Sequence, residues 1–362
     1  MMKMAAGKFQ HHMIREIFEE PRVIRDTLGL CKRKLRNVME DIKPSRFGMI
    51  YITGSGTSYH AGLAGQYALS SLADLTTSLI PASEFSTWIP PSAKDFLLIA
   101  FSQSGESSDI LAATEAAVDK EAEVLAVTNT QDSSLAKTAK FALLTQAGKE
   151  QAVTATKTYV AQLAAIYQLS VELGEGLKKI LQIDLTKLRS SLEKAANFVE
   201  ETLKTQNSVV REIANKYRKN SFFFLLGSGP NYATALEGAL KLKESCNIFA
   251  EGYASREFLH GPMQLVNEKT PMFFIVSPGE SVEEWATLMN RFRKFGAPVI
   301  SIACEDKEIV ESSTDSIFVP KGLPPVFSPM LYVVPLQLFS YYSSIARGLN
   351  PDRPEKLSKV VR

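Results

Sequence analysis

Six short apolar runs, three in each half of the chain, predict the core of the fold. They read FGMIYI, FLLIAF and AEVLAVT in the first half, and FFFLL, MFFIV and PVISIA in the second. They are mostly apolar throughout rather than alternating, which is typical of strands covered on both faces of a sheet. Because polar or glycine-rich loops and then helical patterns follow, we expect an α/β fold with doubly wound parallel sheets. The runs occupy Phe47–Ile52, Phe96–Phe101, Ala122–Thr128, Phe222–Leu226, Met272–Val276 and Pro298–Ala303.

Other stretches carry the apolar spacing of helices. Pro21 interrupts one such pattern between Ile14 and Leu28, which predicts two short helices or one bent helix. Further helices are expected at Cys31–Ile42, at Thr154–Leu169 and, continuing the last, at Leu173–Ala195.

The loops after the apolar runs repeat along the chain. GSG at 54–56 returns at 227–229, and SGES at 104–107 returns as PGES at 278–281, with offsets of 173 and 174 residues. Such a repeat predicts two tandem copies of one α/β subdomain. The expected parts are an N-terminal helical segment (1–45), a first subdomain (46–183), a helical linker (184–209), a second subdomain (210–345) and a C-terminal tail (346–362).

Composition and charge exclude several classes of protein. The 41 basic and 39 acidic residues give a net charge of +2, and no basic run is interleaved with aromatic residues, which argues against nucleic-acid binding. Cys31, Cys246 and Cys304 lie far apart without a CxxC pair, so we expect no disulfide framework and no metal site. No membrane-length apolar stretch and no signal peptide is evident, so a reduced, cytoplasmic setting is expected.

The loop after the second apolar run is rich in hydrogen-bond donors. Backbone N–H groups and the dipole at a helix N-terminus favour an anion, and Thr57 and Ser58 open a neighbouring helix. No lysine or P-loop pattern is present, so a sugar phosphate fits better than a nucleotide with magnesium. The alternative is ordinary helix capping by serine. The predicted phosphate ligands are Ser58, Ser102, Gln103, Ser104 and Ser107.

The corresponding loop in the second half has lost most of these donors, with Pro278 in place of one of them. We therefore expect one phosphate site per chain, in the first half.

The stretch Ala239–His260 holds candidates for proton chemistry. Lys241 and Glu244 stand three residues apart on one helical face, so their side chains can converge. His260 follows at a Gly-Pro break. A carboxylate, a cation and a histidine are the groups needed to move protons on a small molecule. The alternative for the Lys-x-x-Glu pair is a solvated ion pair on the surface.

Several pieces of the chain, in order, resemble the sugar isomerase (SIS) domain family, and within it the isomerase domain of the glucosamine-6-phosphate synthases. The resemblance implies two SIS subdomains, no cofactor, and a C-terminal tail that closes the active site. The pieces are HHMIREIFEEP (11–21), GSGTSYHAG (54–62), SQSGES (102–107), ATKTYVAQL (155–163), ALEGALKLKES (235–245), EFLHGP (257–262) and VPLQLFSYYSSIARGLNPDRPEKLSKVV (334–361).

The resemblance also implies a role for individual residues. Glu244 would move the proton between C1 and C2 of the open sugar, with Lys241 beside it. His260 would open the ring, acting from the other subunit of a homodimer, and Lys359 would form a Schiff base with the carbonyl. The resemblance further implies substrate contacts at Gly56, Thr57, Val153 and Ala155.

The chain departs from the family around these groups. Ser55-Gly56 replaces a cysteine, Leu259 replaces a lysine, and Ser255-Arg256 replaces Ala-Gly. The chain also reaches the isomerase motif by residue 11, which leaves no room for the synthases' glutaminase domain.

We therefore expect a glucosamine-6-phosphate deaminase. A fructosamine-6-phosphate deglycase, a phosphosugar isomerase or synthase-type aminotransferase, and a non-catalytic phosphosugar sensor are the alternatives.

Overall fold

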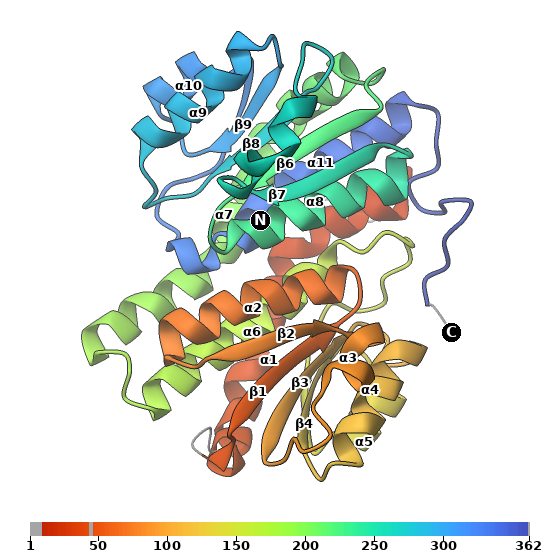
Figure 1. Ribbon diagram of the computed structural model, residues 1–362, viewed down its shortest axis with the longest axis vertical. Helices are drawn as coiled ribbons and strands as arrows, with labels where there is room; N and C mark the ends of the chain where they lie inside the picture. The colour runs from red at the N-terminus through yellow and green to blue at the C-terminus, as the bar shows by residue number, and fades with distance from the viewer. Residues whose placement is uncertain (1–8, 43–45, 361–362) are drawn as a thin grey trace. The chain divides into compact units, whose positions relative to one another are not determined.

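The computed structural model describes residues 9–42 and 46–360. Within them it contains two parallel five-stranded sheets flanked by helices (Figure 1). The predicted α/β class with doubly wound parallel sheets is confirmed. The outer ends of the expected N-terminal segment and C-terminal tail, 1–8 and 361–362, lie outside the described residues, as do 43–45. The chain divides into two compact units, which we describe separately.

The first-sheet unit comprises described residues 22–42, 46–149, 157–196 and 360. Its strand order is β2-β1-β3-β4-β5, with every neighbouring pair parallel. The three apolar runs of the first half become its central strands, which confirms those predictions. The strands are β1 (Met49–Gly54), β2 (Thr77–Pro81), β3 (Phe96–Ser102), β4 (Glu123–Thr128) and β5 (Phe141–Leu144).

Helices cover both faces of this sheet. Helix α2 packs along α6, where a Cβ on Gly65 would come within 2.6 Å of the Ile166 side chain, so glycine permits the close approach. Nearly every side chain of α6 from Lys157 to Val171 is buried, which explains its apolar sequence. On the other face Phe85, Leu98 and Ile110 belong to one core cluster. The helices are α2 (Thr57–Ala73), α3 (Ala82–Trp88), α4 (Ser108–Val118), α5 (Ser134–Thr138) and α6 (Lys157–Gly176).

The second-sheet unit comprises described residues 9–21, 150–156 and 197–359. Its strand order is β10-β9-β8-β6-β7, again parallel throughout. Figure 1 shows α9 and α10 beside the β8–β9 side of this sheet. The strands are β6 (Phe222–Gly227), β7 (Phe249–Ala254), β8 (Met272–Val276), β9 (Val299–Ala303) and β10 (Asp315–Phe318). The helices are α8 (Asn231–Cys246), α9 (Val282–Lys294), α10 (Lys307–Ser312), α11 (Pro329–Ala346) and the 3-10 turns η2 (Glu257–His260), η3 (Pro262–Leu265) and η4 (Pro325–Phe327).

The two sheets have equivalent connectivity. In each, the first strand lies between the second and the third, and the fourth and fifth follow outward. Both first strands end in a glycine at a tight turn. A Cβ would lie 2.8 Å from the Ser58 carbonyl carbon at Gly54, and 2.2 Å from the Asn231 carbonyl oxygen at Gly227. The repeated GSG thus marks one geometry, in which the chain doubles back from strand to helix.

Four strands were not predicted, namely β2, β5, β7 and β10. They include both edge strands of each sheet. Strands β2, β7 and β10 are largely partly exposed and lack a continuous apolar run. Strand β5 reads FALL and is mostly buried, but it is only four residues long.

Two helical predictions need correction. Helix α1 (His12–Asp41) runs through Pro21 without a break, where two or three shorter helices were expected. Ile14, Ile17, Ile24 and Leu28 are all buried, and packing of this face offsets the backbone hydrogen bond that proline removes. The expected continuation Leu173–Ala195 is interrupted, because α6 ends at Gly176 and α7 (Gln182–Lys216) begins a new helix that contains the whole expected linker.

Glu20 on α1 is fully buried. Burial raises the pKa of its carboxyl well above the usual value, the neighbouring Gln337 side chain lowers it in part, and the Glu150 carboxylate raises it again. The folded protein therefore holds this proton more tightly than the unfolded chain. Stability from this group is complete below about pH 4.5 and is lost as the pH rises toward the folded pKa.

We expect Glu20→Gln to stabilise the protein at pH 8 by about 1–3 kcal/mol, because an amide is neutral in both states, whereas Glu20 must take up a proton or be buried as a charge on folding. The gain should vanish near pH 4, where Glu20 is protonated in both states. Urea unfolding at the two pH values measures it, with Glu19→Gln as the neighbouring control. An equal gain at both pH values would contradict the assignment.

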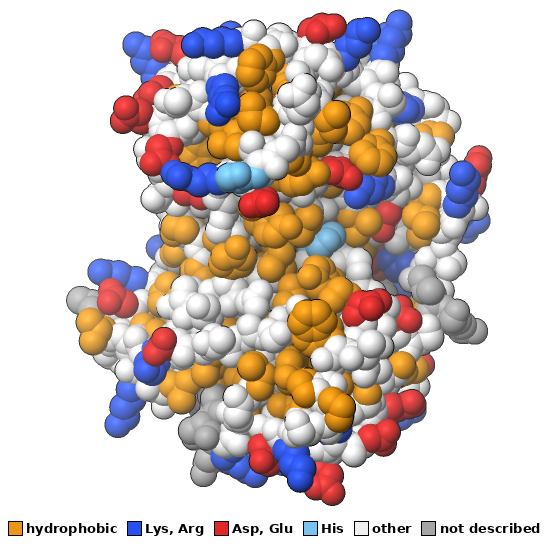
Figure 2. Space-filling view, viewed as in Figure 1, with side chains coloured by type: hydrophobic (Ala, Val, Ile, Leu, Met, Phe, Trp, Pro, Cys, Tyr) orange, Lys and Arg blue, Asp and Glu red, His pale blue; other side chains and the backbone are white. Residues whose placement is uncertain are grey.

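The surface shows mixed charge. On the face seen in Figure 2, Lys and Arg side chains are interspersed with Asp and Glu, so that face carries no extended patch of one sign. In the described part of the chain, no helix is both long and apolar enough to cross a membrane. Cys31 and Cys246 are buried free thiols, and Cys304 is partly exposed and also free.

Candidate functional site

Three charged side chains meet on helix α8 of the second-sheet unit. The Lys241 ammonium lies 2.7 Å from Glu244 Oε2 and 3.2 Å from Glu237 Oε1. Lys241 and Glu237 are fully buried, whereas the Glu244 side chain is 22% exposed. The predicted convergence of Lys241 and Glu244 is present, and the alternative of a solvated surface pair is wrong.

The surroundings of Lys241 keep it charged. Burial lowers the pKa of its ammonium, but the Glu237 and Glu244 carboxylates raise it by more, so the net pKa is above the usual value. Lys241 therefore acts as a fixed cation rather than as a base. Glu244 is the member of the cluster that can reach solvent, and so the one that can exchange a proton with a ligand.

A second ion pair of the same unit ties the C-terminal tail to residues 150–156. Lys359 Nζ lies 2.5 Å from Glu150 Oε2, and also donates to the carbonyl oxygens of Ala152 at 2.7 Å and Val153 at 3.4 Å. The Glu150 side chain is fully buried, and its other oxygen accepts the Thr156 N–H at 2.9 Å. The tail residue Lys359 is thus held in one place, not frayed.

Residues near the start of the described chain form hydrogen bonds to the same loop, residues 150–156. The buried Glu16 carboxylate accepts the N–H groups of Gln151 at 2.6 Å and Ala152 at 3.2 Å. Asp352 accepts the N–H groups of His12 and Met13 at 2.8 and 2.7 Å, and its carbonyl accepts the Val153 N–H. Residues far apart in sequence therefore fix the loop that carries the predicted substrate contacts Val153 and Ala155.

The predicted phosphate loop lies in the first-sheet unit. Strands β1 and β3 are neighbours, with Thr53 opposite Ala100, so the loops after them lie at the same edge of the sheet. Ser102 Oγ accepts the Gly105 N–H at 3.0 Å, and Ser104 Oγ accepts the Glu106 N–H at 3.2 Å. These bonds shape the loop and leave the hydroxyl protons available to a ligand.

The capping alternative does not account for the two helix starts. Ser107 is the N-cap of α4 but makes no side-chain bond to the helix, and Gly56 caps α2 without a side chain. Ser58 is occupied by Gln162, with Nε2 3.0 Å from its hydroxyl. Thr57 forms the first residue of α2. Helix N-termini without side-chain caps offer their N–H groups to an anion.

The sequence profile of the SIS domain family matches residues 46–172 and 216–347. The two matched segments contain all ten strands of the two sheets. The chain belongs to the SIS domain family.

Relatives extend beyond the two SIS segments. The isomerizing glutamine–fructose-6-phosphate aminotransferase of Clostridium tetani is 37% identical over an alignment of 362 positions, which covers 98% of this chain and 59% of that protein. The chain therefore spans less than two thirds of the length of this relative.

Solved structures share the SIS fold. The C-terminal domain of glucosamine-fructose-6-phosphate aminotransferase from Francisella tularensis matches with a TM-score of 0.86 at 25% identity, covering 97% of this chain and all of that one. A glucosamine-6-phosphate deaminase from Thermotoga maritima matches with a TM-score of 0.78 at 24% identity, covering 97% and 99%. The second likeness concerns the fold alone.

The structure groups the predicted residues of this SIS chain into three sets. Lys241 and Glu244 lie together, Lys359 lies beside Val153, and the phosphate residues lie in the other unit with Gly56 and Thr57. No hydrogen bond or ion pair within the described residues joins His260 to the first two sets. This histidine is exposed on η2 and makes no hydrogen bond within the described residues.

Sequence reasoning missed two buried acids, Glu237 and Glu150. Glu237 stands four residues before Lys241, a spacing that could have been recognised on a helix. Glu150 lies 209 residues before Lys359, and no local pattern could have paired them. No group of three or more potential metal ligands occurs in 9–42 and 46–360.

Proposed function

We propose that this chain is a glucosamine-6-phosphate deaminase, which turns glucosamine 6-phosphate and water into fructose 6-phosphate and ammonia. The observation that carries the proposal is the partly exposed Glu244 carboxylate, 2.7 Å from a buried, permanently charged Lys241. A base beside a fixed cation suits proton transfer next to a carbonyl, because the cation stabilises the oxygen that gains negative charge.

The steps follow from these groups. His260 assists opening of the ring, and Glu244 takes the proton from C2 of the open aldose and returns it to C1. This leaves an imine at C2. The Lys359 amine attacks C2 and expels ammonia, and water then hydrolyses the Lys359 imine to give fructose 6-phosphate. Glu150 is the acceptor for the proton that the Lys359 ammonium must lose first, since the two groups are 2.5 Å apart.

The phosphate would bind to the first-sheet loop. Ser102, Gln103, Ser104 and Ser107 supply neutral donors there, and the N-termini of α2 and α4 supply backbone N–H groups. Neutral donors suit a dianion that must be released after each turnover.

The net direction of the reaction distinguishes the deaminase from a synthase-type aminotransferase. Amination and isomerisation by such a site are reversible, so low free ammonia favours release. The name of the Clostridium tetani relative favours a second candidate, the isomerising part of a glutamine-dependent aminotransferase.

The deciding experiment measures ammonia from glucosamine 6-phosphate with glutamine absent. Release with stoichiometric fructose 6-phosphate supports the deaminase. Interconversion of glucose and fructose 6-phosphates without ammonia release would instead indicate a phosphosugar isomerase. In a parallel assay with a fructosamine 6-phosphate as substrate, release of glucose 6-phosphate would indicate a deglycase. Binding of these sugar phosphates without turnover would indicate a sensor.

Lys359 offers a direct test of the imine. We expect sodium borohydride with fructose 6-phosphate to attach the sugar to the peptide containing Lys359, and Lys359→Met to abolish the adduct. Glu150→Gln should lower the yield of adduct, because the lysine loses its proton acceptor. Mass spectrometry of the digest measures the adduct in the wild type and in each variant. Lys356→Met, on the exposed part of the tail, is the control, and a full adduct in Lys359→Met would refute the assignment.

We further propose a homodimer in which His260 serves the site of the other subunit, since its side chain is exposed and makes no hydrogen bond within the described residues of its own chain. Co-expressed His260→Ala and Glu244→Gln chains should then recover activity that neither homodimer has, because one site in each mixed dimer is intact. Activity assays on the purified mixture measure this. No recovery in a mixture proven to contain mixed dimers would place His260 in its own subunit's site.

A further inference from the structure

The second sheet has its own switch point. In open parallel sheets ligands bind outside the carboxyl ends of the strands, where the strand order reverses. In the first sheet this point lies between β1 and β3, next to the phosphate loop. In the second sheet it lies between β6 and β8.

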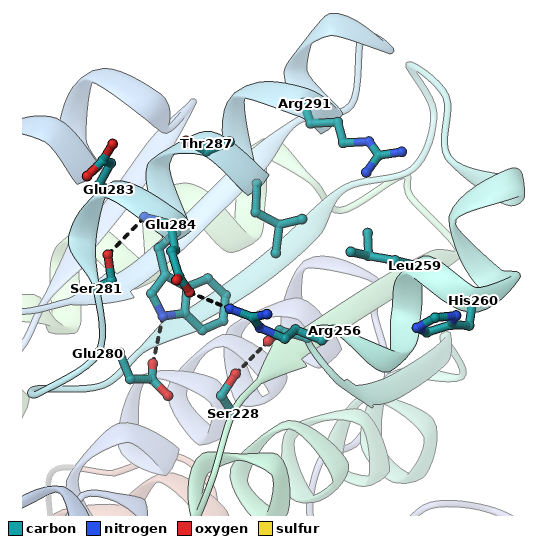
Figure 3. A pocket seen from close by; sticks show the side chains of 13 residues that line it. Ser228, Arg256, Leu259, His260, Glu280, Ser281, Glu283, Glu284, Thr287 and Arg291 are labelled. Carbon is teal, nitrogen blue, oxygen red and sulfur yellow. Dashed lines mark hydrogen bonds and ion pairs between the residues drawn. The ribbon is translucent and has the colours of Figure 1, made fainter.

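A cavity of about 910 Å³ opens at this second point, and all its lining residues belong to the second-sheet unit. Figure 3 shows side chains that follow three different strands converging on it. Ser228 follows β6, Ser255 follows β7 and Glu280 follows β8, while His260 lies at its margin. Its volume is that of a small-molecule site.

Each copy of the loop has a glutamate at the equivalent position, and the two glutamates make different hydrogen bonds. Glu106 in the first copy turns outward, accepting the Ser134 N–H at 2.8 Å and its hydroxyl at 2.9 Å. Its equivalent 174 residues on, Glu280, turns back into its own loop. Glu280 Oε2 accepts the Ser277 N–H at 3.3 Å and the Trp285 indole N–H at 2.6 Å.

The second loop, residues 277–281, therefore carries a carboxylate within it, that of Glu280. A phosphate at this loop would meet the Glu280 carboxylate, and most of the donors proposed to bind phosphate in the first copy are missing here. Glu283 and Glu284 in the first turn of α9 offset the positive end of that helix as well. Phosphate is thus disfavoured at this switch point on electrostatic grounds.

The lining holds three glutamates, at 280, 283 and 284, against two arginines, Arg256 and Arg291, and this excess of acid favours a cation beside Glu280. Burial raises the pKa of the Glu280 carboxyl, and no cationic side chain pairs with it in the described chain. Arg256 is engaged by Glu284 at 2.6 Å instead. The Ser228 and Ser255 hydroxyls lie 2.5 Å apart, so the cavity also offers hydroxyl groups that can donate and accept.

We propose that this cavity is a second ligand site, which binds a small ammonium-bearing polyol such as an unphosphorylated amino sugar. Its ammonium would pair with Glu280 and its hydroxyls with Ser228 and Ser255. The proposal goes beyond the deaminase function and does not depend on it.

The test is calorimetric titration of the full chain with D-glucosamine, in the presence of saturating fructose 6-phosphate to fill the phosphosugar site. We expect binding to persist under these conditions, and D-glucose, which lacks the ammonium, to bind at least about tenfold more weakly. Glu280→Gln should weaken glucosamine binding by a similar factor. Glu106→Gln, the same change at the equivalent position of the other loop, should leave it unchanged.

A second variant keeps the test decisive if Glu280→Gln fails to fold. Thr287 lines the cavity from the exposed side of α9, so Thr287→Trp should fold and obstruct the site. Loss of glucosamine binding in both variants supports the proposal. Displacement of glucosamine by fructose 6-phosphate, equal binding of glucose, or unchanged binding in Thr287→Trp would overturn it.

Discussion

Replacing Glu244 with glutamine is expected to slow ammonia release from glucosamine 6-phosphate by about 10²–10⁴-fold, the usual loss on removing a general base. An amide keeps the size of the side chain and its contact with Lys241 but cannot take the C2 proton. Lys241 retains Glu237 as a charged partner, 3.2 Å away, so the fold should persist.

The measurement is a continuous ammonia assay at saturating substrate, with thermal unfolding to verify folding. Glu212→Gln, an exposed carboxylate on α7, is the matched control and should behave as wild type. Proton exchange between C2 of the substrate and deuterated water should fall in parallel. A folded Glu244→Gln protein with wild-type turnover would show that another group moves the proton.

Replacing Lys241 with methionine is expected to destabilise the protein by about 3–5 kcal/mol, as found when one partner of a buried ion pair is removed. The reason is Glu237, which is fully buried and would be left without its cation. Activity should also be lost, because Glu244 loses the positive charge beside it. Urea unfolding measures the first effect and the ammonia assay the second.

Two comparisons make this prediction specific. Lys243→Met changes an exposed lysine on the same helix and should cost little. Adding Glu237→Met to Lys241→Met should restore much of the stability but no activity, since an apolar pair replaces the buried charges while the cation stays absent. If Lys241→Met alone were as stable as wild type, the buried ion cluster would not exist as described.

The local sequence predicted the central strands and the convergence of Lys241 with Glu244. Both depend on short-range rules: strands buried on both faces are apolar throughout, and residues three apart on a helix are neighbours. The same rules failed at Pro21, where packing of buried Ile17 and Ile24 kept α1 continuous. They also failed at the edge strands, because β2, β7 and β10 are largely partly exposed and β5 has only four residues.

The sequence could not predict the pairing of Lys359 with Glu150 or the inward turn of Glu280. The first joins residues 209 apart. The second gives two equivalent glutamates opposite orientations, because Trp285 stands near one and Ser134 near the other.

The sequence by itself thus determined the α/β class, the duplication and the residue types available for chemistry, because these follow from periodicity and from spacing along the chain. The tertiary structure decided which of those residues are buried, which charges are paired, and which neighbours the glutamate of each duplicated loop contacts. Burial and charge pairing depend on neighbours brought together only by folding, so no reading of local pattern could supply them.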